Sequence, residues 1–150
     1  MHRKIQIQVI IPDVNLLVYA YNKQAVRHAP AKAWWEATLN ANTPVGLPWI
    51  TSSGFIRLMT HPRITAEPLF PDDAVDLVRS WLDQPAVVVL QPGPKFAGLF
   101  FGYLEKIGAA GNLTTDAQLA ALAVENQAEL HSNDTDFSRF DGLRWRNPLK

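Results

Sequence analysis

The chain has 150 residues, a length that one hydrophobic core can serve, so we expect a single domain over residues 1–150 and exclude a two-domain enzyme. Hydrophobic residues make up 47% and charged residues 19%, which excludes a largely disordered chain. Because 14 Lys and Arg balance 14 Asp and Glu, no net charge attracts polyanions, and the lack of Cys excludes disulfides and thiolate chemistry.

The first half of the chain begins with a strand at residues 5–11, where apolar residues alternate with Gln before a buried run. That run is broken by Gln and too short to span a membrane, which predicts a cytoplasmic protein. A helix running through Phe55 and Met59 is expected to take its N-cap from Thr51, Ser52 or Ser53. Between the first strand and this helix we expect a helix at residues 31–39, a turn at 40–44 and a brief strand at 45–47.

The second half alternates helices and strands. The uninterrupted β-branched run at residues 86–90 is typical of a central parallel strand. The spacing of Thr115 and Gln118 predicts a capping box that opens a helix ending near residue 127. We also expect helices at residues 72–82 and 96–107 and a strand at 128–131. A loop at 132–137 and an edge strand at 143–146 complete the chain.

Strands that alternate with helices at these lengths predict an α/β fold, a three-layer α/β/α arrangement with a mainly parallel central sheet. In such sheets ligands bind beyond the carboxyl ends of the strands. The sequence therefore directs attention to the residues that follow the strands.

Four acidic residues fall at that edge. Asp13 follows the first strand, Asp134 and Asp136 follow the strand ending at residue 131, and Asp116 opens a helix between them. Taken singly, each also fits a structural role in an Asx turn, a first helical turn or a loop. Taken together, they repel one another unless a cation lies among them, and oxygen ligands without Cys favour Mg²⁺ or Mn²⁺.

Four phrases carry a resemblance to a known family. In order along the chain they are IPDVNLL at 11–17, FIRLMTHP at 55–62, LTTDAQLAALA at 113–123 and SNDTDF at 132–137. Together with the closing stretch at 140–148 they resemble the PIN-domain ribonuclease toxins of the VapC type over nearly the whole chain. The resemblance implies a single PIN domain, a metal-dependent endoribonuclease, a VapB-like antitoxin as partner and a homodimer.

The resemblance also implies roles for individual residues. Asp13 and Asp116 match the principal Mg²⁺ ligands, Asp134 matches a carboxylate that faces the metal, and Asp136 matches one that supports it. Two small polar residues match positions that orient ligands or waters, namely Asn15 and Ser132.

One departure from the family pattern concerns a Glu that most relatives carry on the helix after the second strand. Here that stretch reads TSSGF, with Gly54 at the Glu position, which leaves the number of metal ions open. The alternative interpretation is therefore a non-catalytic or weakly active PIN-like module that binds RNA or a partner. A receiver domain would also gather acids at a sheet edge, but its late Lys is missing between Lys106 and Lys150.

Contacts to RNA must come from local basic residues, since the net charge is zero. The candidates are Arg57, Arg63, Arg144 and Arg146. Adjacent aromatic residues at 34–35 and 100–101 cannot all face one core, so we expect at least one of each pair to be exposed or at an interface.

Overall fold

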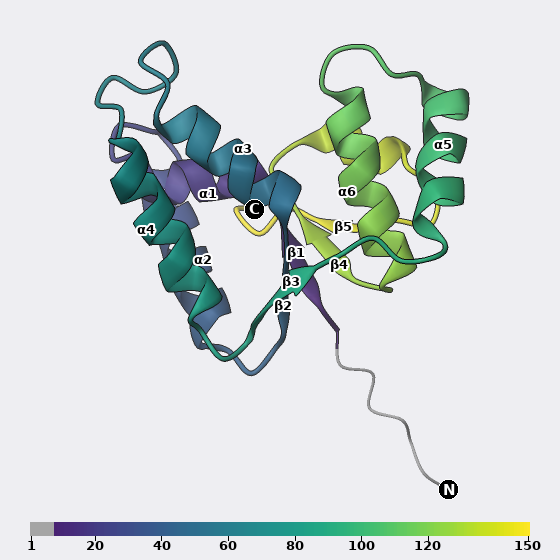
Figure 1. Cartoon of the computed structure of the whole chain (residues 1–150), viewed down its shortest axis with the longest axis horizontal. Helices are drawn as coiled ribbons and strands as arrows, with labels where there is room; N and C mark the ends of the chain where they lie inside the picture. The colour runs from purple at the N-terminus through teal and green to yellow at the C-terminus, as the bar shows by residue number, and fades with distance from the viewer. Residues whose placement is uncertain (1–7) are drawn as a thin grey trace, which may run out of the picture.

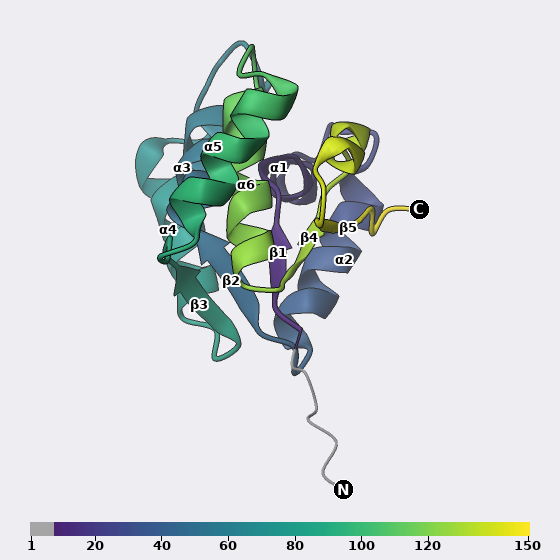
Figure 2. The same ribbon diagram turned by 90° about the vertical axis from the view of Figure 1, so that its right-hand side faces the viewer.

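The structure is a computed structural model that describes residues 8–150, so most of the strand predicted at residues 5–11 lies outside the described part. Its centre is a five-stranded sheet in the order β3-β2-β1-β4-β5, and every neighbouring pair is parallel. The strands are β1 (Ile10–Pro12), β2 (Val45–Pro48), β3 (Val87–Leu90), β4 (Glu129–His131) and β5 (Arg144–Arg146). Figure 2 shows them side by side in this order.

Helices connect the strands along the chain. They are α1 (Val14–Tyr21), α2 (His28–Asn40), α3 (Trp49–Met59), α4 (Pro71–Leu82), α5 (Phe96–Ile107), α6 (Leu113–Glu125) and a 3₁₀ helix, η1 (Thr135–Arg139). In Figure 1, α1 to α4 gather on one side of the sheet, and α5 and α6 lie on the other. The predicted three-layer α/β fold with a parallel sheet is confirmed.

Each side of the sheet has its own hydrophobic core. On the side of α1 to α4, the fully buried aromatic side chains are Trp35, Phe55 and Trp81, and their rings contact one another edge to face. On the other side, the small residues of α6 let that helix lie close to β1 and β4, where Leu130 and Ile11 are fully buried. The sheet is therefore held from both faces, which fixes the edge where its strands end.

Three local predictions were wrong. The strand at Val87–Leu90 lies at the edge of the sheet formed by residues 8–150 instead of its centre, and Val88 is 55% exposed. Helix α3 begins at Trp49, directly after β2, and has no side-chain N-cap, because the capping position is occupied by Pro48; Thr51 is inside the first turn and donates its hydroxyl to the carbonyl oxygen of Pro12 at 3.1 Å. Helix α6 begins at Leu113, so Thr115 is inside its first turn and forms no capping box.

Of the two adjacent aromatic pairs, only the pair at 100–101 has the exposed member that was expected. Trp35 is fully buried and Trp34 donates to a buried His, so neither indole is free on the surface. Phe101, by contrast, is 56% exposed on α5. Within residues 8–150 no helix is long and apolar enough to cross a membrane.

Candidate active site

Asp13 occupies the junction between β1 and α1. It caps α1, since its Oδ1 accepts the backbone N–H of Val14 at 2.7 Å. Its own backbone N–H donates to the carbonyl oxygen of His131 at 2.9 Å, which ties the junction to the end of β4. Asp13 is 8% exposed, and burial raises the pKa of its carboxyl against the opposing hydrogen bonds from Ser132 and Val14. Each carboxylate oxygen of Asp13 accepts one hydrogen bond and keeps a further lone pair, so the same residue can cap α1 and serve as the predicted metal ligand.

Ser132 is the centre of the hydrogen bonds in this region. Its hydroxyl donates to Asp13 Oδ2 at 2.7 Å and accepts the backbone N–H of Asp134 at 3.0 Å and, more weakly, Asn15 Nδ2 at 3.5 Å. One donor and two acceptor positions are all that a hydroxyl offers, so Ser132 is fully used. It holds the loop after β4 against the junction after β1.

Asp116 faces the same region from the first turn of α6. It is buried, and burial together with the nearby carboxylates of Asp13, Asp134 and Asp136 raises its pKa to about 7. No side-chain hydrogen bond to this carboxylate occurs within residues 8–150, which distinguishes it from Asp13. Because Asp13, Asp134 and Asp136 all raise the pKa of Asp116, the four predicted acids lie close enough to interact in the folded protein.

A cavity of about 540 Å³ opens between these elements. Its lining combines carboxylates, small polar groups and residues of α3, namely Asp13, Val14, Asn15, Ile50, Ser53, Gly54, Arg57, Leu58, Asn112, Thr115, Asp116 and Asp134. Asp136 is outside this lining: its backbone N–H donates to Asp134 Oδ1 at 2.9 Å, so it steadies the loop at the start of η1.

The donor set of the cavity fits a hard divalent cation. It offers carboxylate oxygens and Asn15 Oδ1, a buried oxygen that accepts no hydrogen bond in the described part of the chain. The mutual repulsion that raises the pKa of Asp116 is the kind that a cation relieves. Even so, no three His, Asp or Glu side chains among residues 8–150 already form a metal-binding cluster. The carboxylates share one opening without forming a preassembled ligand set.

Gly54 has a packing reason to be glycine. It lies on α3 where that helix crosses α1, and a Cβ placed there would stand only 2.9 Å from Val14 Cγ2. Valine is stiff at χ1 and cannot easily turn away. The position where the family resemblance led us to expect Glu is thus one where the two helices approach closely, and it supplies no carboxylate to the cavity.

The basic candidates separate into one that reaches the cavity and three that do not line it. Arg57 lines it from α3, and no ion pair involving Arg57 occurs in the part of the chain that the structure describes. Arg144 instead donates to the carbonyl oxygen of Gln127 near the amino end of β4, away from the carboxyl edge. Arg63 and Arg146 are exposed and also outside the lining.

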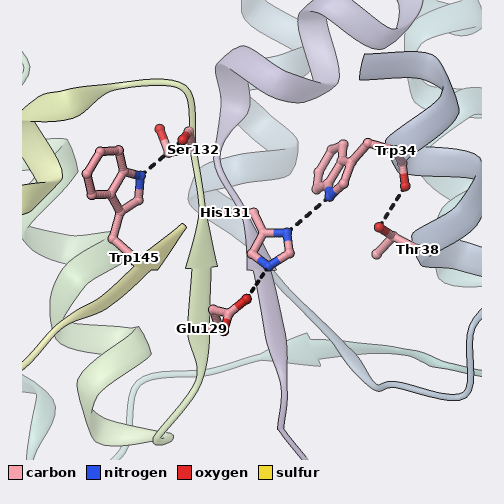
Figure 3. A network of polar contacts seen from close by, with 6 residues as sticks. All are labelled: Trp34, Thr38, Glu129, His131, Ser132 and Trp145. Carbon is pink, nitrogen blue, oxygen red and sulfur yellow. Dashed lines mark hydrogen bonds and ion pairs between the residues drawn. The ribbon is translucent and has the colours of Figure 1, made fainter. Parts of the chain in front are cut away.

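His131 belongs to a second polar network beside the cavity. Figure 3 shows its ring between Trp34 of α2 and Glu129 of its own strand. Trp34 Nε1 donates to His131 Nδ1 at 3.0 Å, so the ring proton of the neutral form is on Nε2, which donates to Glu129 at 2.7 Å. Burial lowers the pKa of His131. These contacts give His131 a structural role, joining α2 to the end of β4.

Sequence reasoning missed three polar or small residues that line the cavity, Ser53, Asn112 and Thr115. Thr115 directly precedes Asp116, and Asn112 is one turn earlier. Had the start of the helix been predicted at Leu113, both residues would have been expected beside Asp116 in the cavity. The sequence analysis instead assigned Thr115 to a capping box and so did not consider it as a cavity residue.

Comparison with known proteins gives four relevant likenesses, to a family model, a curated relative and two solved structures. The PIN domain family model matches residues 10–143. Ribonuclease VapC33 of Mycobacterium tuberculosis is 47% identical over 142 residues, covering 95% of this chain and 99% of that protein.

Two solved structures share the architecture. VapC20 of M. tuberculosis, described as a Sarcin-Ricin loop cleaving toxin, superposes with a TM-score of 0.66 at 19% identity, over 90% of this chain and 98% of that one. VapBC-1 of nontypeable Haemophilus influenzae gives a TM-score of 0.67 at 17% identity, over 95% of this chain and 100% of that one. At such low identity, these two likenesses establish the fold alone.

Proposed function

This chain belongs to the PIN-domain family and to its VapC ribonucleases, and from that premise we propose that it is a divalent-metal-dependent endoribonuclease that hydrolyses RNA phosphodiesters in the cavity bounded by Asp13, Asp116 and Asp134. The observation that carries the proposal is the convergence of these three carboxylates, from segments up to 121 residues apart, on one cavity. Their mutual repulsion supports a cation, Mg²⁺ or Mn²⁺, as the resident cofactor.

The protein's own residues prepare the cavity for this chemistry. A bound Mg²⁺ supplies a Lewis acid that makes water a stronger nucleophile and offsets charge on the phosphate. Asp13, Asp116 and Asp134 would hold the ion, and the unpaired oxygen of Asn15 is available to it or to its waters. Ser132 keeps Asp13 and the Asp134 loop in register, and Asp136 steadies that loop from outside.

Arg57 is the cation placed to contact the substrate. It lines the cavity from α3 and has no ion-pair partner within residues 8–150, so its guanidinium is available to a phosphate oxygen. The near-zero net charge predicts that RNA binding rests on this local contact and on the neutralised acids, and is modest in strength.

The decisive experiment incubates the purified protein with total RNA and Mg²⁺ and maps the new 5′ ends. We expect Asp13→Asn and Asp116→Asn each to abolish cleavage, because each removes one negative charge from the ion-holding group. Chelation of divalent ions with EDTA should have the same effect on the parent protein. A rate equal to that of the parent in either variant would remove that residue from the proposed site.

Asp76→Asn is the matched control for these variants. Asp76 is on the exposed side of α4, where it pairs with Arg79 at 3.3 Å, and surface pairs of this kind contribute little to stability. Cleavage by this variant should match that of the parent. If the parent itself neither cleaves RNA nor shows a Mg²⁺-dependent rise in melting temperature, the alternative of a non-catalytic PIN-like module replaces the proposal.

We also propose the partners that the family relationship implies. A VapB-like antitoxin would restrain the enzyme, and the described assembly of VapBC-1 from H. influenzae supports a partner of that kind. A cationic side chain of the antitoxin would be complementary to the carboxylates of the cavity. A homodimer of this chain is the oligomeric state we propose, in keeping with the exposed apolar side chains of Val88 and Val89 on the edge strand β3.

A further inference from the structure

Trp49 is the one of the five Trp residues whose ring is mainly in solvent. Three of the others donate their indole N–H to His131, Tyr21 and the Ser132 carbonyl, and Trp35 is 1% exposed. Trp49 is 53% exposed, and within residues 8–150 its indole forms no hydrogen bond and no ring contact. Exposure alone is common for single apolar side chains, so it is the place of this ring beside the cavity that gives it significance.

The place of Trp49 in the fold is set by the junction of β2 and α3. It is the first residue of α3 and directly follows the carboxyl end of β2, so it lies at the edge of the sheet where the acids gather. The next residue, Ile50, lines the carboxylate cavity. The bond from Thr51 to the Pro12 carbonyl holds this first turn against the end of β1, one residue before Asp13. The position of Trp49 relative to the carboxylates is therefore fixed.

Helical spacing aligns Trp49 with two residues of the cavity. Ser53 and Arg57 follow it at intervals of four, so the three side chains form one exposed strip along α3, with about 6 Å of helix between neighbours. Ser53 and Arg57 both line the cavity. The strip thus places an aromatic face at one end, a hydroxyl in the middle and an unpaired guanidinium at the other end.

We propose that Trp49 stacks on an unpaired base of the RNA beside the phosphate held in the cavity. This inference rests on the proposed ribonuclease activity and adds a specificity-determining residue to it. Aromatic side chains bind RNA by stacking on bases that are free of a helix, whereas bases inside a duplex present no open face. Ser53 and Arg57 carry polar groups along the same strip, where the backbone of that nucleotide would pass.

The kinetic test compares Trp49→Ala, Trp49→Phe and the parent on a single-stranded oligoribonucleotide and on the same sequence in a duplex. We expect Trp49→Ala to raise KM roughly tenfold on the single strand with kcat little changed, and Trp49→Phe to restore most of the loss because it retains an aromatic face. On the duplex, whose bases present no open face, Trp49→Ala should leave KM unchanged.

Phe101→Ala is the matched control, since Phe101 is an aromatic residue of similar exposure on the far side of the sheet. Its KM should equal that of the parent. An unchanged KM on the single strand in Trp49→Ala, or an equal rise in Phe101→Ala, overturns the proposal. If light scattering shows that Trp49→Ala changes the mass of the particle while KM stays constant, Trp49 is a contact between copies and the proposal is wrong.

A binding measurement separates this inference from the proposed activity. In Asp116→Asn, which we expect to bind without cleaving, titration with single-stranded RNA should quench part of the indole fluorescence. The quenching should disappear in Asp116→Asn combined with Trp49→Phe. Quenching that persists in the double variant contradicts stacking on Trp49, whatever the cleavage assay shows. Absence of any cleavage by the parent counts against the proposed activity and not against this contact.

Discussion

At the scale of single residues, the arrangement of the acids depends on Ser132. Its hydroxyl joins Asp13, Asn15 and the backbone of Asp134, and so connects segments that are up to 119 residues apart. From the sequence, Ser132 could be named as a small polar residue beside an acidic motif. Its three partners could not be read there, because they come from an Asx-capped helix and a loop that meet only after the sheet has formed.

The raised pKa of Asp116 gives a prediction about stability and pH. An acid with a pKa near 3.8 when unfolded and about 7 when folded binds more protons in the folded state between those values. Its contribution to the free energy of unfolding therefore falls as pH rises from about 4 to 7. Without divalent ions, we expect Asp116→Asn to be more stable than the parent at pH 7.5 by roughly 2 kcal/mol, a gain that shrinks towards pH 4.5.

Urea denaturation at the two pH values measures this difference. Asp76→Asn, whose carboxylate is exposed on α4, should differ from the parent by the same small amount at both. Millimolar Mg²⁺ should stabilise the parent at pH 7.5 and have little effect on Asp116→Asn. A gain in Asp116→Asn that does not depend on pH would show that charge repulsion is not its cause.

At the scale of elements, the close approach of α1 and α3 sets the width of the cavity. Both helices line it, α1 through Val14 and Asn15 and α3 through Gly54 and its neighbours. The sequence predicted α3 but assigned it a side-chain N-cap. The structure instead uses Thr51 to bind the end of β1, because α3 begins directly at the end of a buried strand and leaves no room for a capping loop.

Gly54→Ala tests that close approach. In an open helix this change stabilises by up to about 1 kcal/mol. Here the new Cβ would stand 2.9 Å from Val14 Cγ2, so we expect a loss of about 1–3 kcal/mol in the free energy of unfolding. Gly98→Ala on α5 is the matched control, since nothing lies within 4 Å of its Cβ position, and it should stabilise the protein.

Combining Gly54→Ala with Val14→Ala distinguishes a clash from other causes. Removing the Val14 methyl groups should recover part of the loss, so that the double variant is more stable than the sum of the single changes predicts. Strict additivity, measured by urea denaturation of all four proteins, would contradict a steric contact between α1 and α3.

At the scale of the whole molecule, charge is balanced overall but divided locally. The 14 acids and 14 Lys and Arg cancel, yet among residues 8–150 three acids share one cavity with one lining cation, Arg57. The zero net charge first argued against a nucleic-acid partner. With a divalent cation among the carboxylates, the surface that an RNA meets would be less acidic than the formal sum indicates.

Salt dependence measures how many cations contact the RNA. For Asp116→Asn with Mg²⁺ held constant, we expect the affinity for single-stranded RNA to fall with NaCl at a slope of roughly one in a log–log plot. Adding Arg57→Gln should weaken binding and flatten that slope. Arg144→Gln is the control, because Arg144 is held at the opposite end of β4, and the slope should stay the same. If Arg144→Gln changed the slope and Arg57→Gln did not, Arg144 and not Arg57 would be the residue that contacts the RNA.

Hydrophobic periodicity and strand length, which are local properties, were enough to predict the α/β class, the parallel sheet and the edge on which the acids converge. The same local signals misplaced β3, because an uninterrupted β-branched run forms a strand equally well at the centre or the edge, and strand order is settled by how the crossover helices pack.

The sequence by itself determined which acids meet at the edge of the sheet, since Asp13, Asp116 and Asp134 were identified from their places after strands and at a helix start and now line one cavity. Only the tertiary structure decided which cations and aromatic residues accompany them. Arg57 and Trp49 share a strip of α3 beside the cavity, while Arg144 is turned to the other end of the sheet. Such choices depend on contacts between segments distant in sequence, which local patterns do not encode.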